Sequence, residues 1–105
     1  MENSNNQRLF GMLGFAMRAG KLVIGTDNII HSLKKGQARL VVVSKTASEG
    51  TKSRLSTKSE FYKTVLIEVD IDAERLGKML GKTYAPVAVA VTDERFAEEI
   101  KKASV

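Results

Sequence analysis

Apolar residues along the chain alternate between helical spacing and short continuous runs, and this alternation predicts helices separated by strands. Most of the helical segments carry apolar residues three or four positions apart, although the apolar face of the segment 48–59, mainly Leu55, is thin. The run Leu40–Val43 is apolar throughout, which is typical of a strand buried on both faces. The predicted strands cover residues 22–24, 40–43, 65–69 and 87–91. The predicted helices cover about 9–19, 26–35, 48–59, 72–80 and 92–102.

Capping and turn residues mark the ends of these helices. Thr26 and Thr92 precede apolar periodic segments and are predicted N-caps, because a side-chain oxygen at that position accepts a hydrogen bond from a first-turn N–H. Residues 1–7 are polar and are expected to be frayed. Glycines that can end a helix follow three of the segments: Gly20, Gly36 and Gly81.

Strands that alternate with helices favour an α/β fold in which helices cover both faces of one sheet. We therefore expect a three-layer α/β/α sandwich with a four-stranded sheet. Connections of only a few residues leave no room for a second domain, so residues 1–105 are expected to form a single domain. The order of the strands in the sheet does not follow from the pattern.

Charge is divided unevenly along the chain. The 17 basic and 12 acidic residues give a formal net charge of +5. Residues 1–58 contain ten basic and three acidic side chains, whereas residues 59–105 contain seven and nine. A segregated basic surface suggests a polyanionic partner such as nucleic acid. A lysine-rich surface that is merely solvated is the alternative, and charge alone leaves both open.

Several classes of protein are excluded by composition. The chain has no cysteine, which removes disulfides, thiolate metal sites and cysteine nucleophiles, and fits a reducing cytoplasmic location. His31 is the single histidine, so we expect no histidine-rich metal site and no cofactor. The apolar region Leu9–Ile24 is interrupted by Arg18 and Lys21, so we expect no membrane span.

One segment imitates a nucleotide-binding loop. Residues 77–83 read Gly-Lys-Met-Leu-Gly-Lys-Thr, but a P-loop has four residues between its glycines and lies between a strand and a following helix. Here the segment has three residues between glycines and follows a helix. The carboxylate pair Asp93 and Glu94 stands at a helix start, where capping explains it without catalysis. We therefore expect no enzymatic activity.

Residues 25–31 carry groups suited to nucleic acid. Gly25 ends a strand, and the first turn of the next helix exposes Thr26, Asp27 and Asn28. Free N–H groups at a helix start attract phosphate, and an asparagine amide offers a donor and an acceptor to a base edge. A second polar loop, residues 44–48, follows the next strand, and loops at one edge of a sheet can converge into one surface.

Five blocks of sequence, in this order and spacing, are also familiar: GFAMRAGKLVIG (14–25), KGQARLVVV (35–43), ASEGTK (47–52), LGKMLGK (76–82) and VAVAVTD (87–93). With them the chain resembles the ribosomal L-seven-Ae / L-thirty-e family, particularly its small bacterial YlxQ-type members, over about residues 9–97. The resemblance implies an α/β/α sandwich with a mixed four-stranded sheet. It also implies RNA binding, with kink-turn RNA as the usual ligand, in ribosomal or other ribonucleoprotein settings.

The RNA-reading motif of that family, Gly-x-Asn-Glu-x-x-Lys, falls on Gly25, Asp27, Asn28 and His31, and only the glycine matches. Asp27 replaces an amide with an acceptor-only carboxylate, and Asn28 replaces a carboxylate with an amide. His31 replaces a fixed cation with a ring that is mostly neutral at pH 7. Two further family loops fall on residues 44–46, which are basic here although usually acidic, and on residues 82–86. These substitutions predict weak recognition of a standard kink-turn.

Together, these observations predict a non-enzymatic, monomeric RNA-binding protein of the cytoplasm, with ribosomal or another structured RNA as partner and the ribosome as a further candidate. The alternative is a protein–protein adaptor that keeps the fold and has lost kink-turn recognition. Gly25 stands at the centre of the expected site. Expected phosphate contacts are Lys21, Lys34, Lys35, Lys45, Lys52 and Arg54. Expected base contacts are Thr26, Asp27, Asn28 and His31, with Thr46, Ala47 and Tyr84 packing alongside.

Overall fold

A computed structural model describes residues 4–104 of the protein, and in it helices and strands alternate as the sequence pattern predicts. The strands are β1 (Leu22–Ile24), β2 (Leu40–Ser44), β3 (Leu66–Val69) and β4 (Ala88–Val91). The helices are α1 (Ser4–Arg18), α2 (Thr26–Lys34), α3 (Glu49–Phe61), α4 (Ala73–Met79) and α5 (Glu94–Ala103).

The strands form one mixed sheet in the order β1-β4-β2-β3. Strand β4 runs antiparallel to both of its neighbours, and β2 runs parallel to β3. In the centre of the sheet, Val42 pairs with Val89 on one side and with Ile67 on the other. It follows that β1, β2 and β3 all end at one edge of the sheet, where β4 begins. We call this edge the carboxyl edge and the opposite one the amino edge.

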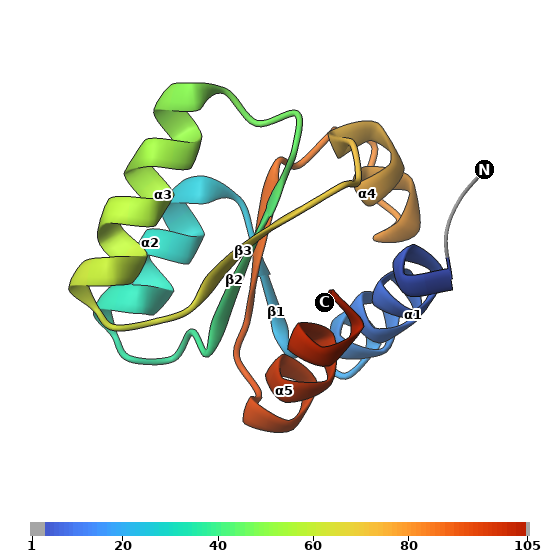
Figure 1. The fold of residues 1–105 in the computed structure, drawn as a ribbon, viewed down its shortest axis with the longest axis horizontal. Helices are drawn as coiled ribbons and strands as arrows, with labels where there is room; N and C mark the ends of the chain where they lie inside the picture. Colours follow the sequence, from blue (N-terminus) through green and yellow to red (C-terminus); the bar gives the residue numbers. More distant parts are fainter. Residues whose placement is uncertain (1–3, 105) are drawn as a thin grey trace.

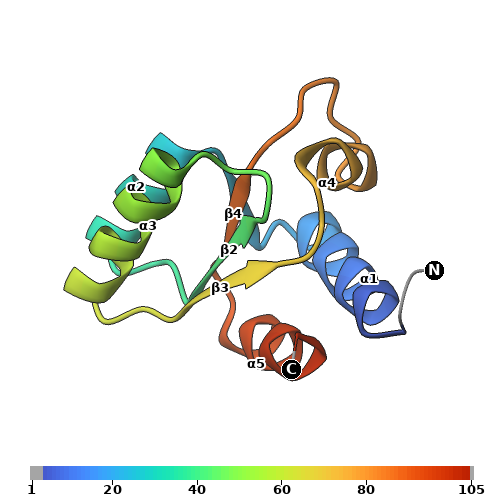
Figure 2. The same ribbon diagram turned by 45° about the horizontal axis from the view of Figure 1, so that its top comes forward.

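Helices cover both faces of the sheet, which confirms the expected three-layer sandwich (Figure 1). Helices α2 and α3 lie on one face, and α1, α4 and α5 lie on the other, as the turned view in Figure 2 also shows. Each face has its own core: Val41 packs with Ile29 and Leu55, whereas its neighbour Val42 packs with Leu13. Adjacent residues of a strand point to opposite faces, so the continuous apolar run in β2 serves both cores.

Two of the predicted N-caps are wrong by one residue. The N-cap of α2 is Gly25, whose carbonyl accepts the Ile29 N–H at 2.9 Å, so Thr26 already lies inside the helix. The N-cap of α5 is Asp93 rather than Thr92. Its carboxylate accepts hydrogen bonds from two first-turn N–H groups, at 2.9 and 3.1 Å. A carboxylate beside a threonine is the better cap for the positive end of a helix dipole.

Helix α1 begins earlier than the apolar pattern predicts. Its first residue is Ser4, inside the polar segment 1–7 that was expected to be frayed; residues 1–3 lie outside the described part of the chain. Each residue added to an existing helix gains one backbone hydrogen bond, so polar residues can prolong a helix whose later positions pack in a core. Here Leu9 and Leu13 supply that packing.

Candidate nucleic-acid interface

Four chain segments meet at the carboxyl edge of the sheet. Backbone hydrogen bonds join them: Gly25 N–H donates to the Ala88 carbonyl at 3.4 Å, and Ser44 N–H donates to the Val87 carbonyl at 2.7 Å. Lys45 N–H donates to the carbonyl at the end of β3. The start of α2 follows β1, and the second polar loop follows β2. The structure brings both segments beside the loop that leads into β4.

The start of α2 presents unpaired donors. Gly25 has φ 99°, a conformation that side-chain-bearing residues rarely adopt, and it offers no side chain to cap the helix. Among residues 4–104, the N–H groups of Thr26, Asp27 and Asn28 have no hydrogen-bond acceptor. Such a helix start attracts anionic groups, phosphate among them.

Asp27 and Asn28 on this turn already have side-chain partners, and that of Asp27 is Arg54. Asn28 Nδ2 donates to the Ile24 carbonyl at 3.0 Å, so one of its amide protons secures the turn between β1 and α2. His31 follows Asp27 by four residues and is exposed, which places it one turn farther along on the same helix face.

The loop after β2 is held by its hydroxyl groups. Ser44 is buried, and its Oγ donates to the Ile71 carbonyl at 2.6 Å. Thr46 Oγ1 accepts a hydrogen bond from the Ala73 N–H at 3.0 Å, which fastens the loop to the start of α4. Ala47 is only 6% exposed and packs in the core under α2 and α3, so it supports the loop from beneath.

Three cations that were expected to bind phosphate lie against carboxylates. Arg54 on α3 reaches across to Asp27 on α2, and Lys52 reaches β3. The Lys45 and Arg54 pairs are exposed, and exposed pairs are worth only about 0–1 kcal/mol, so an incoming phosphate can replace the carboxylate in these two. The nitrogen–oxygen distances are 2.7 Å for Lys45–Asp70, 3.4 Å for Lys52–Glu68 and 3.2 Å for Arg54–Asp27.

The surroundings of Lys45 raise the pKa of its ammonium group. The Asp70 carboxylate raises the pKa of Lys45, first by accepting a hydrogen bond from its ammonium group and then by its charge, and Asp72 adds a smaller effect. A lysine whose pKa is raised stays protonated through the neutral range. The ammonium of Lys45 thus stays charged beside the Asp70 carboxylate at neutral pH.

Tyr84 lies on the third loop of this edge and is 57% exposed. It borders a shallow hollow of about 240 Å³ that also involves Lys78 and Lys82. A neighbouring hollow of about 420 Å³ is lined by both Thr46 and Ala85, so the Tyr84 loop lies next to the loop after β2. The sequence analysis placed Lys82 on this loop but did not connect it with Lys78, which is exposed four residues earlier near the end of α4.

Three further predicted phosphate contacts lie elsewhere. Lys34 and Lys35 stand at the far end of α2, which at nine residues is about 13 Å long, and so lie at the amino edge. Lys21 precedes β1, and its carbonyl accepts a hydrogen bond from the Thr92 N–H beyond the end of β4, also at the amino edge. The basic residues of the first half of the sequence therefore divide between two edges of the molecule.

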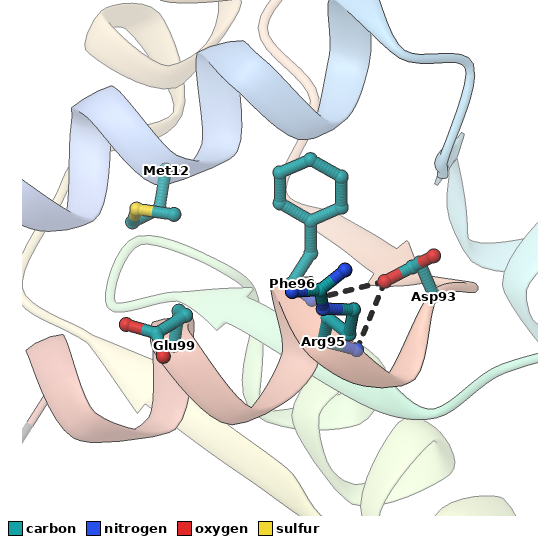
Figure 3. Close-up of a pocket in the computed structure, with 5 residues that line it drawn as sticks. All are labelled: Met12, Asp93, Arg95, Phe96 and Glu99. Carbon is teal, nitrogen blue, oxygen red and sulfur yellow. Dashed lines mark hydrogen bonds between the residues drawn. The ribbon is translucent and has the colours of Figure 1, made fainter.

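A separate hollow of about 290 Å³ lies between α1 and α5 (Figure 3). Met12 and Phe96 form its apolar wall, and Arg95 and Glu99 lie on α5 beside it. The Asp93 carboxylate is occupied as the cap of α5. Within residues 4–104, no group of three His, Asp or Glu side chains is placed to hold a metal ion, and no helix is long and apolar enough to cross a membrane.

The segment that imitates a nucleotide-binding loop ends a helix. Helix α4 closes at Met79, Gly81 follows with φ 70°, and the chain then leads to β4. A P-loop requires the opposite order, strand before helix. The lysine in this segment, Lys82, is exposed and borders the hollow beside Tyr84.

Comparison with known proteins places this fold in a family. Residues 7–101 match the model of the ribosomal protein L7Ae/L30e/S12e/Gadd45 family. RNA-binding protein YlxQ of Enterococcus faecium is 33% identical over 102 residues, 97% of this chain and 96% of that protein. YlxQ of Bacillus subtilis is 38% identical over 91 residues, 87% and 89% of the two chains. A solved structure of a Bacillus halodurans protein of unknown function superposes with a TM-score of 0.85 at 28% identity, covering 91% of this chain and 95% of that one.

Proposed function

The chain belongs to the ribosomal protein L7Ae/L30e/S12e/Gadd45 family, and on that premise we propose that it binds structured RNA, without catalysis, through the carboxyl edge of its sheet. The observation that carries the proposal is the convergence of the start of α2, which no side chain caps, with the loops that hold Lys45 and Tyr84. Two relatives that are named RNA-binding proteins support it. Ribosomal RNA or another structured RNA is the partner we propose.

Phosphate and base contacts divide among the groups at this edge. The free N–H groups of the first turn of α2 and the ammonium of Lys45 suit backbone phosphates. Arg54 joins them when phosphate displaces Asp27 from its guanidinium. Thr26, Asn28 and His31 offer polar groups to base edges, and the exposed ring of Tyr84 offers a face on which an unpaired base can stack.

We further propose that recognition of a standard kink-turn is weak. Guanine presents acceptors, N7 and O6, in the major groove and therefore needs protein donors. Asp27 offers only acceptors and is engaged by Arg54, and Asn28 directs a proton to the Ile24 carbonyl rather than outward. The edge therefore keeps its phosphate-binding groups and presents few donors to guanine.

RNA binding at this edge is tested by charge reversal. The double variant Lys45→Glu/Arg54→Glu should lose most of its affinity for structured RNA in filter binding at low salt, because it removes two phosphate contacts and adds repulsion. Lys101→Glu/Lys102→Glu makes the same change in charge on α5 and should keep most of the affinity. If in-cell crosslinking of the natural protein recovers proteins and no RNA, the adaptor alternative replaces this proposal.

Specificity is tested by restoring the family motif. The variant Asp27→Asn/Asn28→Glu/His31→Lys should bind a standard kink-turn about tenfold more tightly or better, since one good bidentate base contact is worth roughly 1–3 kcal/mol. A duplex of equal length without the kink should show a much smaller gain. Tight binding of the kink-turn by the natural protein, with no improvement in the variant, contradicts the interpretation of these three residues.

A further inference from the structure

Positive charge without a carboxylate partner gathers at the amino edge, away from the proposed site. Lys34 and Lys35 stand at the end of α2, and Lys58 and Lys63 stand at the end of α3. Among the described residues, none of these four ammonium groups lies within ion-pair distance of a carboxylate. At the carboxyl edge, Lys45 and its basic neighbours on α3 are paired with carboxylates, whereas Lys78 and Lys82 beside Tyr84 have no ion pair among the described residues. We call the four unpaired side chains the lysine surface.

The topology of the sheet brings these four residues together. Helices α2 and α3 both begin at the carboxyl edge and run back along the same face, so that their final turns lie side by side (Figures 1 and 2). They lead into β2 and β3, which are neighbouring parallel strands about 4.8 Å apart, with Val41 paired to Leu66. Leu33 and Tyr62, one from each helix end, pack in the same core.

Helix capping does not account for the amount of charge. Each helix carboxyl end carries about half a negative charge, so the two ends together offset about one lysine. Glu60 is the only acidic residue between positions 28 and 48 or between 53 and 67. Four lysines against one glutamate leave a formal surplus of three, well above what the two helix ends neutralise.

Lys63 occupies a position where three of the other helices have glycine. It has φ 58°, and its N–H and that of Thr64 donate to the Glu60 and Ser59 carbonyls, which closes the helix. The same pair of hydrogen bonds ends α1, α2 and α4, and there the residue with positive φ is glycine. A lysine in this conformation costs stability that glycine would not. The end of α3 thus carries a strained lysine where three other helices carry glycine.

Phe61 adds an aromatic face to the lysine surface. Its side chain is 74% exposed, the most exposed of the large apolar residues described. The ring stands edge-on to Tyr62, with centroids 4.9 Å apart and planes at 87°. Because Tyr62 is partly buried against the core, it gives the exposed ring a fixed support. An exposed aromatic ring among lysines is the arrangement that binds single-stranded nucleic acid, by stacking and by phosphate contacts.

We propose that the lysine surface and Phe61 bind a second, single-stranded segment of RNA, so that the protein joins two RNA segments at opposite edges of its sheet. The joining role rests on the proposed function, because it needs a first RNA at the carboxyl edge. The lysines meet backbone phosphates, and a base stacks on Phe61. Recognition by stacking and charge depends little on sequence.

A capture experiment tests this proposal. Structured RNA that the protein binds is immobilised and saturated with protein, which occupies the carboxyl edge, and a fluorescent twelve-nucleotide oligouridine is then added at low salt. The natural protein should retain about one oligonucleotide per bound molecule. Lys34→Gln/Lys35→Gln should lower its affinity for the oligonucleotide about tenfold or more and flatten its salt dependence. Lys101→Gln/Lys102→Gln removes two lysines from α5 and should change neither.

Two single variants separate binding from folding. Phe61→Ala should weaken capture about fivefold or more, the lower end of what one lost base stack costs. Lys63→Gly should also weaken capture, yet it should raise the thermal midpoint by several degrees because glycine relieves the positive φ. A variant that is more stable and binds less RNA cannot owe its loss to unfolding.

The possible failures are distinct. If immobilised RNA holds the protein but no oligonucleotide is captured, the second surface is refuted and the proposed function stands. If no structured RNA is bound, oligouridine is titrated directly onto the free protein. Lys34→Gln/Lys35→Gln should then lower the affinity of the free protein for oligouridine, and an unchanged affinity refutes RNA binding by the lysine surface. If polyglutamate of equal charge displaces the oligonucleotide as well as unlabelled oligouridine does, and Phe61→Ala has no effect, the surface fits an acidic protein and the assignment to RNA is overturned.

Discussion

Gly77 lies where helix α4 passes against the backbone of the Tyr84 loop. A Cβ atom added there would stand 2.4 Å from the Tyr84 carbonyl oxygen and 3.1 Å from Cδ of Pro86. Real Cβ atoms do not approach backbone oxygen so closely, and Pro86 is buried, so the loop could not yield without leaving its place. The absence of one methyl group therefore sets the position of the third loop of the proposed site.

We expect Gly77→Ala to lower the free energy of unfolding by about 1–3 kcal/mol, the usual result of overpacking a buried site. It should also weaken RNA binding, because the displaced loop carries Tyr84. Urea denaturation and filter binding measure the two effects. Gly11→Ala is the matched control: Gly11 is exposed in α1 with nothing within 4 Å of the added atom, so it should stabilise by about 0.5–1 kcal/mol. Equal effects of the two substitutions would contradict this account.

Helix α5 shows how one side chain fixes the start of an element. Asp93 satisfies two N–H groups of the first turn with one carboxylate oxygen, and α5 in turn buries Ala97 and Ile100 against the sheet and α1. The expected N-cap, Thr92, is half-buried one residue earlier, and its N–H donates to the Lys21 carbonyl. The two neighbours thus have separate roles, the cap and the end of the sheet.

Removing the cap should destabilise the protein measurably. Asp93→Ala is expected to lower the free energy of unfolding by about 1 kcal/mol, since typical cap losses are about 0.5–2 kcal/mol. Thr92→Ala keeps the carboxylate and should cost less than half as much. Chemical denaturation of both variants decides between them. A larger effect of Thr92→Ala would show that the cap is assigned to the wrong residue.

Most of the elements were predictable from the sequence because they have a clear apolar period, whereas α3, whose apolar face is mainly Leu55, was predicted from its cap Ser48. The details that failed depend on single residues or on distant partners. From the sequence, Thr26 is a better candidate N-cap than Gly25, because its side chain can accept a hydrogen bond. Only the structure shows that Gly25, with φ 99°, is the residue just outside the helix. The loops at the carboxyl edge were predicted to converge from the rule for strand ends. The pairing of Lys45 with Asp70 was not, because these residues are 25 positions apart and meet only through the parallel β2–β3 pair.

At the scale of the whole molecule, a ligand that binds only the folded chain raises the free energy of unfolding of the entire domain. Structured RNA at about 100 times its Kd should add about 2.7 kcal/mol to the free energy of unfolding. For a domain of this size, each kcal/mol raises the thermal midpoint by about 4–8 °C. ATP and GTP should produce no shift, because residues 77–83 end a helix and form no phosphate loop. A nucleotide-dependent shift that Lys82→Ala abolishes would contradict the structural assignment of that segment.

The place of β4 in the sheet has a consequence for synthesis. Strand β4 lies between β1 and β2, so these two strands share no hydrogen bonds and must wait for residues 88–91 before a continuous sheet exists. A chain growing on the ribosome presents β1, α2 and β2 long before it presents β4, and it can hold them only loosely until then. The edge that carries Gly25 and Lys45 therefore takes shape late. Truncated chains that end before residue 88 should neither fold nor bind RNA at the carboxyl edge, because the strand at the centre of the sheet is missing.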